Sequence, residues 1–253
     1  MTSGAQPVRD ATTVVLLRDG VDGVETWLLQ RVAQLEFAAG MAVFPGGAVD
    51  AGDADLPSVT DHPHHVADGF GCSITLGRAL VGGAVREVFE ETGVLLTSPT
   101  AELSAAQPDV ESGRVAFGEL LRAHGLRVNA DALWPWAHWI TPAGRPRRYD
   151  THFFVAALPP GAQAADLTSE STSAHWTSPR QALADQESGR LRLMPPTISV
   201  LTSIAGFHSS AQVIDAAAGR VVEVARPVLS EGCGSSRAGL PDASGIGSGI
   251  GGQ

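Results

Sequence analysis

The chain has 253 residues, enough for one large domain, and its 43% hydrophobic and 17% charged residues are typical of an ordinary globular protein. Its net charge of −10 argues against a nucleic-acid backbone as a partner. The apolar runs are far shorter than the roughly 20 residues of a membrane helix, and the first ten residues contain no apolar signal-peptide core, so we expect no membrane partner. Two distant cysteines, Cys72 and Cys233, indicate a reduced, cytoplasmic protein.

The first third of the chain predicts strands. Thr12–Leu17 and Glu25–Arg31 are apolar, and the Asp-Gly pairs between them are typical of a hairpin turn. Met41–Gly47 predicts a third strand that enters a glycine-rich turn. Residues 54–77 show neither helical nor strand periodicity, and we expect a long loop or insertion there.

The middle of the chain predicts helices. Apolar residues between Arg78 and Thr92 recur at helical spacing, and Gly93 is placed to end that helix. A strand at Val94–Ser98 and a second helix at Arg114–Gly125 should follow.

The last part of the chain predicts a mixture of elements. His138–Pro142 and Arg147–Leu158 indicate strands, Ser178–Gly189 indicates a helix, and a further helix begins at the paired prolines Pro195 and Pro196. From about Leu229 the chain is rich in Gly and Ser, which predicts disorder. We therefore expect an α/β domain over residues 10–228, with a mixed sheet between helices, a helical C-terminal extension and a disordered tail at 229–253.

The predicted helix at 78–92 carries three carboxylates on one face. Glu87, Glu90 and Glu91 are three or four positions apart, so their side chains cluster. Like charges at this spacing cost about 0.2–0.5 kcal/mol per pair, and a divalent cation would remove that cost. Oxygen ligands of this kind suit Mg²⁺ or Mn²⁺. The alternative for such a pattern alone is a solvated acidic surface.

A glycine turn lies upstream, at Phe44–Asp53 (FPGGAVDAGD). Together with Arg86–Val94 (REVFEETGV), this turn resembles the Nudix box, G-x5-E-x7-R-E-U-x-E-E-x-G-U, in which U is a bulky aliphatic residue. The second half of the box matches at every fixed position. In the first half, Asp53 stands where the family has glutamate, and 32 residues rather than seven separate it from Arg86. The box is therefore split by an insertion of about 25 residues.

The insertion resembles one branch of the superfamily, the Nudix motif 19-type proteins, whose characterised members hydrolyse coenzyme A and acyl-CoA. Trp139–Phe154 and Leu193–Thr197 are also similar to that branch. The resemblance implies a Nudix fold, Mg²⁺ or Mn²⁺ as cofactor, a CoA-like nucleotide as substrate, and release of 3′,5′-ADP and a phosphopantetheine half. Nudix proteins are often dimers, so a homodimer is expected. The alternatives are a Nudix hydrolase of ADP-ribose or NADH, and a Nudix-fold binding module without turnover.

Position by position, the resemblance implies a metal site. Glu87, Glu90 and Glu91 would be metal ligands, assisted by a carbonyl near Gly47. Asp53 would either reach the metal through water or close the turn.

The resemblance also implies catalytic roles. Arg86 would hold the carboxylates in register, and Glu90 or Glu91 would take a proton from the attacking water. Glu170 lies where many Nudix proteins have an acidic residue near the metals, so it is a candidate general base; the alternative is a surface glutamate.

A basic cluster and the insertion complete the candidate site. Arg145, Arg147 and Arg148 suit bidentate phosphate binding and are predicted to contact the substrate, although a solvated strand end paired with Asp150 is an equal alternative. The insertion at 54–77, whose histidines we attribute to a flexible loop, is expected to shape or cover the substrate cleft. Its deletion should then raise KM.

Overall fold

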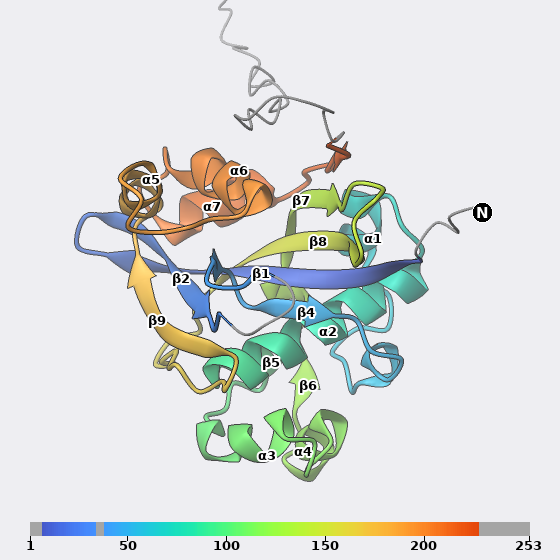
Figure 1. Cartoon of the computed structure of the whole chain (residues 1–253). Coiled ribbons are helices and arrows are strands. Elements are labelled where there is room, and N and C mark those ends of the chain that lie inside the picture. The colour runs from blue at the N-terminus through green and yellow to red at the C-terminus, as the bar shows by residue number, and fades with distance from the viewer. Residues whose placement is uncertain (1–6, 34–37, 228–253) are drawn as a thin grey trace, which may run out of the picture.

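The computed structural model describes residues 7–33 and 38–227, and its centre is a mixed β-sheet (Figure 1). The strand order is β10-β7-β8-β1-β2-β3, with β4 added on β1 and β9 on β2. The strands of this sheet are β1 Val8–Gly20, β2 Gly23–Arg31, β3 Ala42–Val43, β4 Gly46–Ala48, β7 Trp134–Ile140, β8 Arg148–Ala157, β9 Ser171–Thr177 and β10 Val224–Ala225. A two-stranded sheet of β5 Thr97–Ser98 and β6 Arg127–Val128 lies apart from it.

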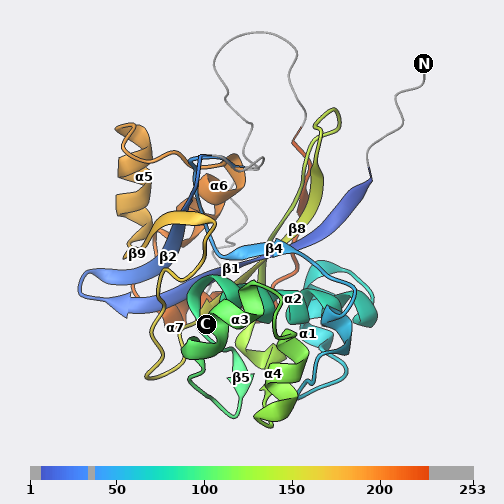
Figure 2. The same ribbon diagram turned by 60° about the horizontal axis from the view of Figure 1, so that its bottom comes forward.

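Helices cover both faces of the large sheet (Figures 1 and 2). One layer contains α5, α6 and α7, and the other contains α1 and α2, with α3 and α4 beyond them next to the small sheet. The helices are α1 His64–Phe70, α2 Ile74–Thr92, α3 Gln107–Glu111, α4 Phe117–Ala123, α5 Pro179–Glu187, α6 Pro195–Ile204 and α7 Ser210–Ala217. The expected three-layer α/β fold with a helical C-terminal extension is confirmed.

The central strand β1 explains how the two cores are divided. Its apolar run alternates between the faces: Val14 and Leu16 pack in the core under α1 and α2, whereas Val15 and Leu17 pack under α6 and α7. A continuous apolar run is the pattern of a strand that is buried on both faces. The predicted hairpin is also confirmed, since β1 and β2 pair antiparallel up to Gly20 and Gly23.

Helix α2 ends at the predicted residue, Thr92, but begins four residues before the predicted start. Gly93 adopts a left-handed conformation with φ of 72°, and its N–H donates to the carbonyl of Phe89. The helix starts at Ile74 rather than Arg78 because the Ser73 hydroxyl caps it by accepting from the N–H of Leu76.

The prediction that residues 54–77 form a long loop is wrong. Part of it forms α1, which buries Val66 and Phe70 in the core, and its last residues are the first turn of α2. A helix of seven residues is too short to show periodicity in the sequence. Deletion of this segment would therefore remove core side chains, so a change in KM alone no longer tests it.

Other expected boundaries also change. The strand at Met41–Gly47 is divided at Phe44–Pro45, because β3 pairs with β2 and β4 pairs with β1. The strand expected at Val94–Ser98 is reduced to Thr97–Ser98, and α3, α7 and β9 are not foreseen. The predicted disordered tail at 229–253 lies outside the described residues. None of the helices in the described part of the chain combines the length and apolarity that a bilayer crossing requires.

Candidate active site

The C-terminal half of α2 packs against the glycine turn at β4. The N–H of Gly46 donates to Glu91 Oε2 at 2.9 Å. A Cβ atom on Gly47 would lie 2.5 Å from Glu87 Oε1, so a larger residue there would displace this carboxylate. The two glycines thus let the backbone of β4 approach the acidic face of the helix directly.

Arg86 organises the carboxylates around it. Its Nε and Nη2 donate to the two oxygens of Asp53 at 2.9 and 3.0 Å, and Nη1 donates to Glu87 at 2.8 Å and Glu90 at 3.1 Å. Nη2 also donates to the carbonyl of Ala48 in β4. The planar guanidinium therefore ties the helix to the turn and offsets part of the negative charge.

Asp53 is brought to this arginine although the insertion separates the two in sequence. Its side chain is only 3% exposed, and Oδ2 also accepts from the N–H of Asp50 at 2.8 Å. These contacts agree with the role of closing the turn. A role in binding metal through water stays a prediction.

The three glutamates of the helix are difficult to ionise together. Burial raises the pKa of Glu90 to about 7, an effect that Arg86 opposes. Burial also raises the pKa of Glu87, and burial together with the charge of Glu87 raises the pKa of Glu91 well above its usual value. This donor set of carboxylates beside a backbone turn fits a hard divalent cation such as Mg²⁺ or Mn²⁺.

Glu170 lies just before β9, and its carboxylate binds Arg31 Nη2 at 2.7 Å. Its side chain is 50% exposed. The charges of both residues act on the pKa of Glu91: Arg31 lowers it and Glu170 raises it. The pair is therefore within electrostatic range of the helix carboxylates. We did not identify Arg31 from the sequence; its place at the end of β2, across from the loop before β9, becomes visible only once these strands pair.

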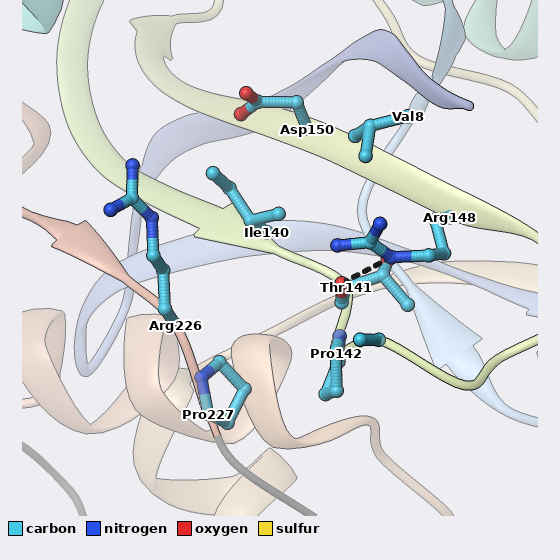
Figure 3. Close-up of a pocket in the computed structure, with 9 residues that line it drawn as sticks. Val8, Ile140, Thr141, Pro142, Arg148, Asp150, Arg226 and Pro227 are labelled. Atoms are coloured by element: carbon cyan, nitrogen blue, oxygen red, sulfur yellow. Dashed lines mark hydrogen bonds between the residues drawn. The ribbon is translucent and has the colours of Figure 1, made fainter. Parts of the chain in front are cut away.

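The predicted arginine cluster lies at another edge of the sheet. Arg145 and Arg147 are exposed before β8, and Arg148 donates from Nε to the carbonyl of Thr141 at 3.1 Å. Arg148 lines a cavity of about 540 Å³ together with Asp150 and Arg226 (Figure 3). None of the helix glutamates lines this cavity. Asp150 pairs with His138.

The fold and the acidic helix together define a class of enzyme, the Nudix hydrolases. A crystal structure of a NUDIX hydrolase from Alicyclobacillus acidocaldarius superimposes with a TM-score of 0.69 at 26% identity, covering 83% of this chain and 96% of the other. Residues 57–204, more than half of the chain, match the family model described as the NUDT19 Nudix domain. The chain therefore belongs to the NUDT19 branch of the Nudix hydrolase superfamily.

Curated relatives agree with this assignment. A Caenorhabditis elegans protein named putative nudix hydrolase 7 is 33% identical over 182 residues, covering 70% of this chain and 54% of that protein. Human acyl-coenzyme A diphosphatase NUDT19 is 29% identical over 248 residues, covering 80% of this chain and 66% of that protein. The Xenopus laevis protein of the same name is 27% identical over 228 residues, with 72% and 60% covered. The chain thus spans between 54% and 66% of the length of these three relatives.

Proposed function

We propose that the chain is a divalent-metal-dependent diphosphatase that cleaves coenzyme A or acyl-CoA into 3′,5′-ADP and the (acyl-)4′-phosphopantetheine half. One observation carries the proposal: three glutamates of one helix stand at a glycine turn, where Glu91 accepts from the N–H of Gly46 and Arg86 pairs with Glu87 and Glu90. Membership of the NUDT19 branch, and the names of the vertebrate relatives, support coenzyme A as the substrate class. We assign residues 10–228 to the catalytic domain.

We infer that Glu87, Glu90 and Glu91 would hold Mg²⁺ or Mn²⁺, with the carbonyl of Gly47 at the same turn. A bound divalent ion neutralises phosphoryl oxygens and lowers the pKa of water. Arg86 keeps the carboxylates in place through its contacts with Asp53, Glu87 and Glu90.

There are two candidates for the group that takes the proton from the attacking water. Glu170 is the candidate general base, and its Oε2 accepts from Arg31. Glu90 or Glu91 is the alternative acceptor within the helix cluster, because burial has raised the pKa of both side chains.

Substrate recognition is proposed to involve Arg145, Arg147 and Arg148. Guanidinium groups bind phosphate oxygens in a bidentate manner, and coenzyme A carries a 3′-phosphate that ADP-ribose lacks. The cavity beside Arg148 provides a recess at that edge of the sheet. Replacement of these arginines by glutamine should therefore weaken hydrolysis of coenzyme A much more than hydrolysis of ADP-ribose.

A product assay on the purified full chain tests the proposal. Coenzyme A, acetyl-CoA, ADP-ribose and NADH are offered separately with Mg²⁺ or Mn²⁺, and products are separated by chromatography. We expect 3′,5′-ADP from the coenzyme A substrates and no product from Glu91→Gln. Cleavage of ADP-ribose or NADH alone would move the specificity to other nucleotides within the superfamily. No cleavage with either metal would favour a binding module.

A further inference from the structure

A second polar cluster, the strand cluster of His138, Asp150 and His152, lies on β7 and β8, and none of its residues belongs to the proposed Mg²⁺ or Mn²⁺ site. His138 and His152 are directly opposite each other in the antiparallel pair, and Asp150 lies two residues before His152, so all three side chains share one face of the sheet. One donor atom from each of the three residues lies within 4.8 Å of the others.

The two imidazoles are buried and incompletely paired. His138 is 7% exposed and His152 is 2% exposed, and their rings stack with centroids 4.0 Å apart. Nε2 of His138 pairs with the Asp150 carboxylate. The Nδ1 atoms of both histidines are buried and find no hydrogen-bond partner among the described residues. A buried polar atom without a partner costs about 1–3 kcal/mol, so a partner for these two nitrogen atoms would stabilise the protein.

The cluster has a route to solvent through the carboxylate. Asp150 is 26% exposed and lines the cavity of about 540 Å³, which Arg148 and Arg226 also line (Figure 3). On the neighbouring strand, Asp10 is opposite Asp150 in the β1–β8 register and is exposed. The opposite side is closed by Phe70, whose ring lies edge-on to His152 with centroids 4.8 Å apart.

We propose that His138, Asp150 and His152 form a second metal site, selective for a borderline ion such as Zn²⁺. Two imidazole nitrogens and one carboxylate are a common zinc ligand set, and the Asp10 carboxylate or a water would complete a tetrahedron. Ligands around Zn²⁺ stand about 3.4 Å apart for bonds of about 2.0–2.1 Å. On binding, the direct contact between His138 and Asp150 would open, and donor separations of up to 4.8 Å would shorten. This site differs from the helix cluster, whose donors are all oxygens and suit Mg²⁺ or Mn²⁺.

The state of the His152 ring is compatible with this site. Burial, and then the neighbouring His138, lower the pKa of His152 to about 4. The ring is therefore neutral at pH 7, which is the form that binds metals. Burial raises the pKa of Asp150, but its hydrogen bond with His138 and the charges of His138, His152 and Arg226 outweigh burial, so the pKa is lowered.

Zinc retention measured by elemental analysis tests the proposal. The full chain is equilibrated with Zn²⁺ in excess Mg²⁺, so that Mg²⁺ competes for the helix carboxylates, and is then separated from free metal. A matched control is His62→Asn/His64→Asn, because those rings also stack, with centroids 5.9 Å apart, but lie outside the cluster. We expect about one Zn²⁺ per chain in the wild type and in this control, and at least a tenfold weaker affinity in His138→Asn and His152→Asn.

Two further measurements keep the result decisive. Substitution of Co²⁺ for Zn²⁺ should give a visible absorption band that disappears in His152→Asn but persists in Glu91→Gln. If a histidine variant fails to fold, Asp150→Asn, whose side chain is partly exposed, should also weaken zinc binding. The proposal is overturned if the wild type retains no zinc, if the cluster variants retain as much as the wild type, or if Glu91→Gln or the control pair releases it.

Discussion

The helix cluster (Glu87, Glu90 and Glu91) lies on α2, whereas the strand cluster lies on the sheet beside α1, and the two balance their charges in different ways. On the helix side, Arg86 is the direct ionic partner of Asp53, Glu87 and Glu90, and Glu91 adds a further carboxylate. On the strands, the Asp150 carboxylate is paired with His138, and the ring of His152 stacks on that of His138. The helix cluster thus offers carboxylate oxygens, whose ionisation a hard cation would favour, whereas the strand cluster offers imidazole nitrogens as well as a carboxylate.

The largest expected effect separates the two clusters by activity. Glu91→Gln removes a proposed metal ligand while preserving the shape of the side chain, and we expect kcat/KM to fall about 10³-fold. Its melting temperature without metal should stay the same or rise, because a buried carboxylate with a raised pKa has been removed. Steady-state kinetics and thermal melts check both expectations.

The matched control for this variant is Glu119→Gln on the exposed side of α4, which should change neither quantity. His152→Asn should show the complementary pattern, with zinc lost and activity kept within about threefold. If Glu119→Gln were as inactive as Glu91→Gln, the helix cluster would not be the active site.

The next effect concerns stability. Arg86→Met leaves Asp53, Glu87 and Glu90 without their shared partner, and removal of one member of a buried ionic network costs about 3–5 kcal/mol. Arg114→Met is the control, because Arg114 pairs with Asp109 on the surface and such pairs contribute about 0–1 kcal/mol. Urea unfolding of the metal-free proteins measures both values. Equal losses in the two variants would show that Arg86 does not organise the cluster.

What the sequence predicts well is the helix cluster, because its residues are local. Glu87, Glu90 and Glu91 lie within five positions of one helix, so 3.6-residue periodicity alone brings them together. The position of Asp53 is harder to predict from the sequence. Asp53 is 33 positions away from Arg86, and the two residues meet only in the folded structure. The strand cluster is invisible in the sequence, because the strand register alone places His138 opposite His152.

The same reason explains the errors in the fold. The long helix and the two apolar strands of the hairpin have strong periodicity, and the structure confirms these three elements. Helix α1 is too short to show a pattern, and β9 is a polar strand whose existence depends on pairing with β2. Likewise, Arg31 and Glu170 are 139 positions apart and meet only through that pairing.

A smaller expected effect, on kcat, tests which residue accepts the proton. Glu170→Gln should lower kcat about 10–100-fold if this residue is the general base, with little change in stability because the side chain is half exposed. Arg31→Gln serves as the comparison: it frees Glu170 from its ion pair and should not reproduce the loss in kcat. A decrease of less than about threefold in Glu170→Gln would assign the proton to Glu90 or Glu91.

The smallest expected effect concerns how the free energy of unfolding of the metal-free protein depends on pH. The pKa of Glu90 is raised to about 7 in the folded state, so its contribution to stability is complete below about pH 4.5 and is lost as pH rises through 7. The pKa of His152 is lowered to about 4, so its contribution is present above about pH 6.5 and is lost as pH falls through 4. The two groups therefore change the unfolding free energy with pH in opposite directions.

Glu90→Gln should make the unfolding free energy fall less between pH 5 and 7, and His152→Asn should make it fall more, each by about 1–2 kcal/mol. Urea titrations at several pH values measure these slopes, and a change of the same sign in both variants would contradict the assignment of the two clusters.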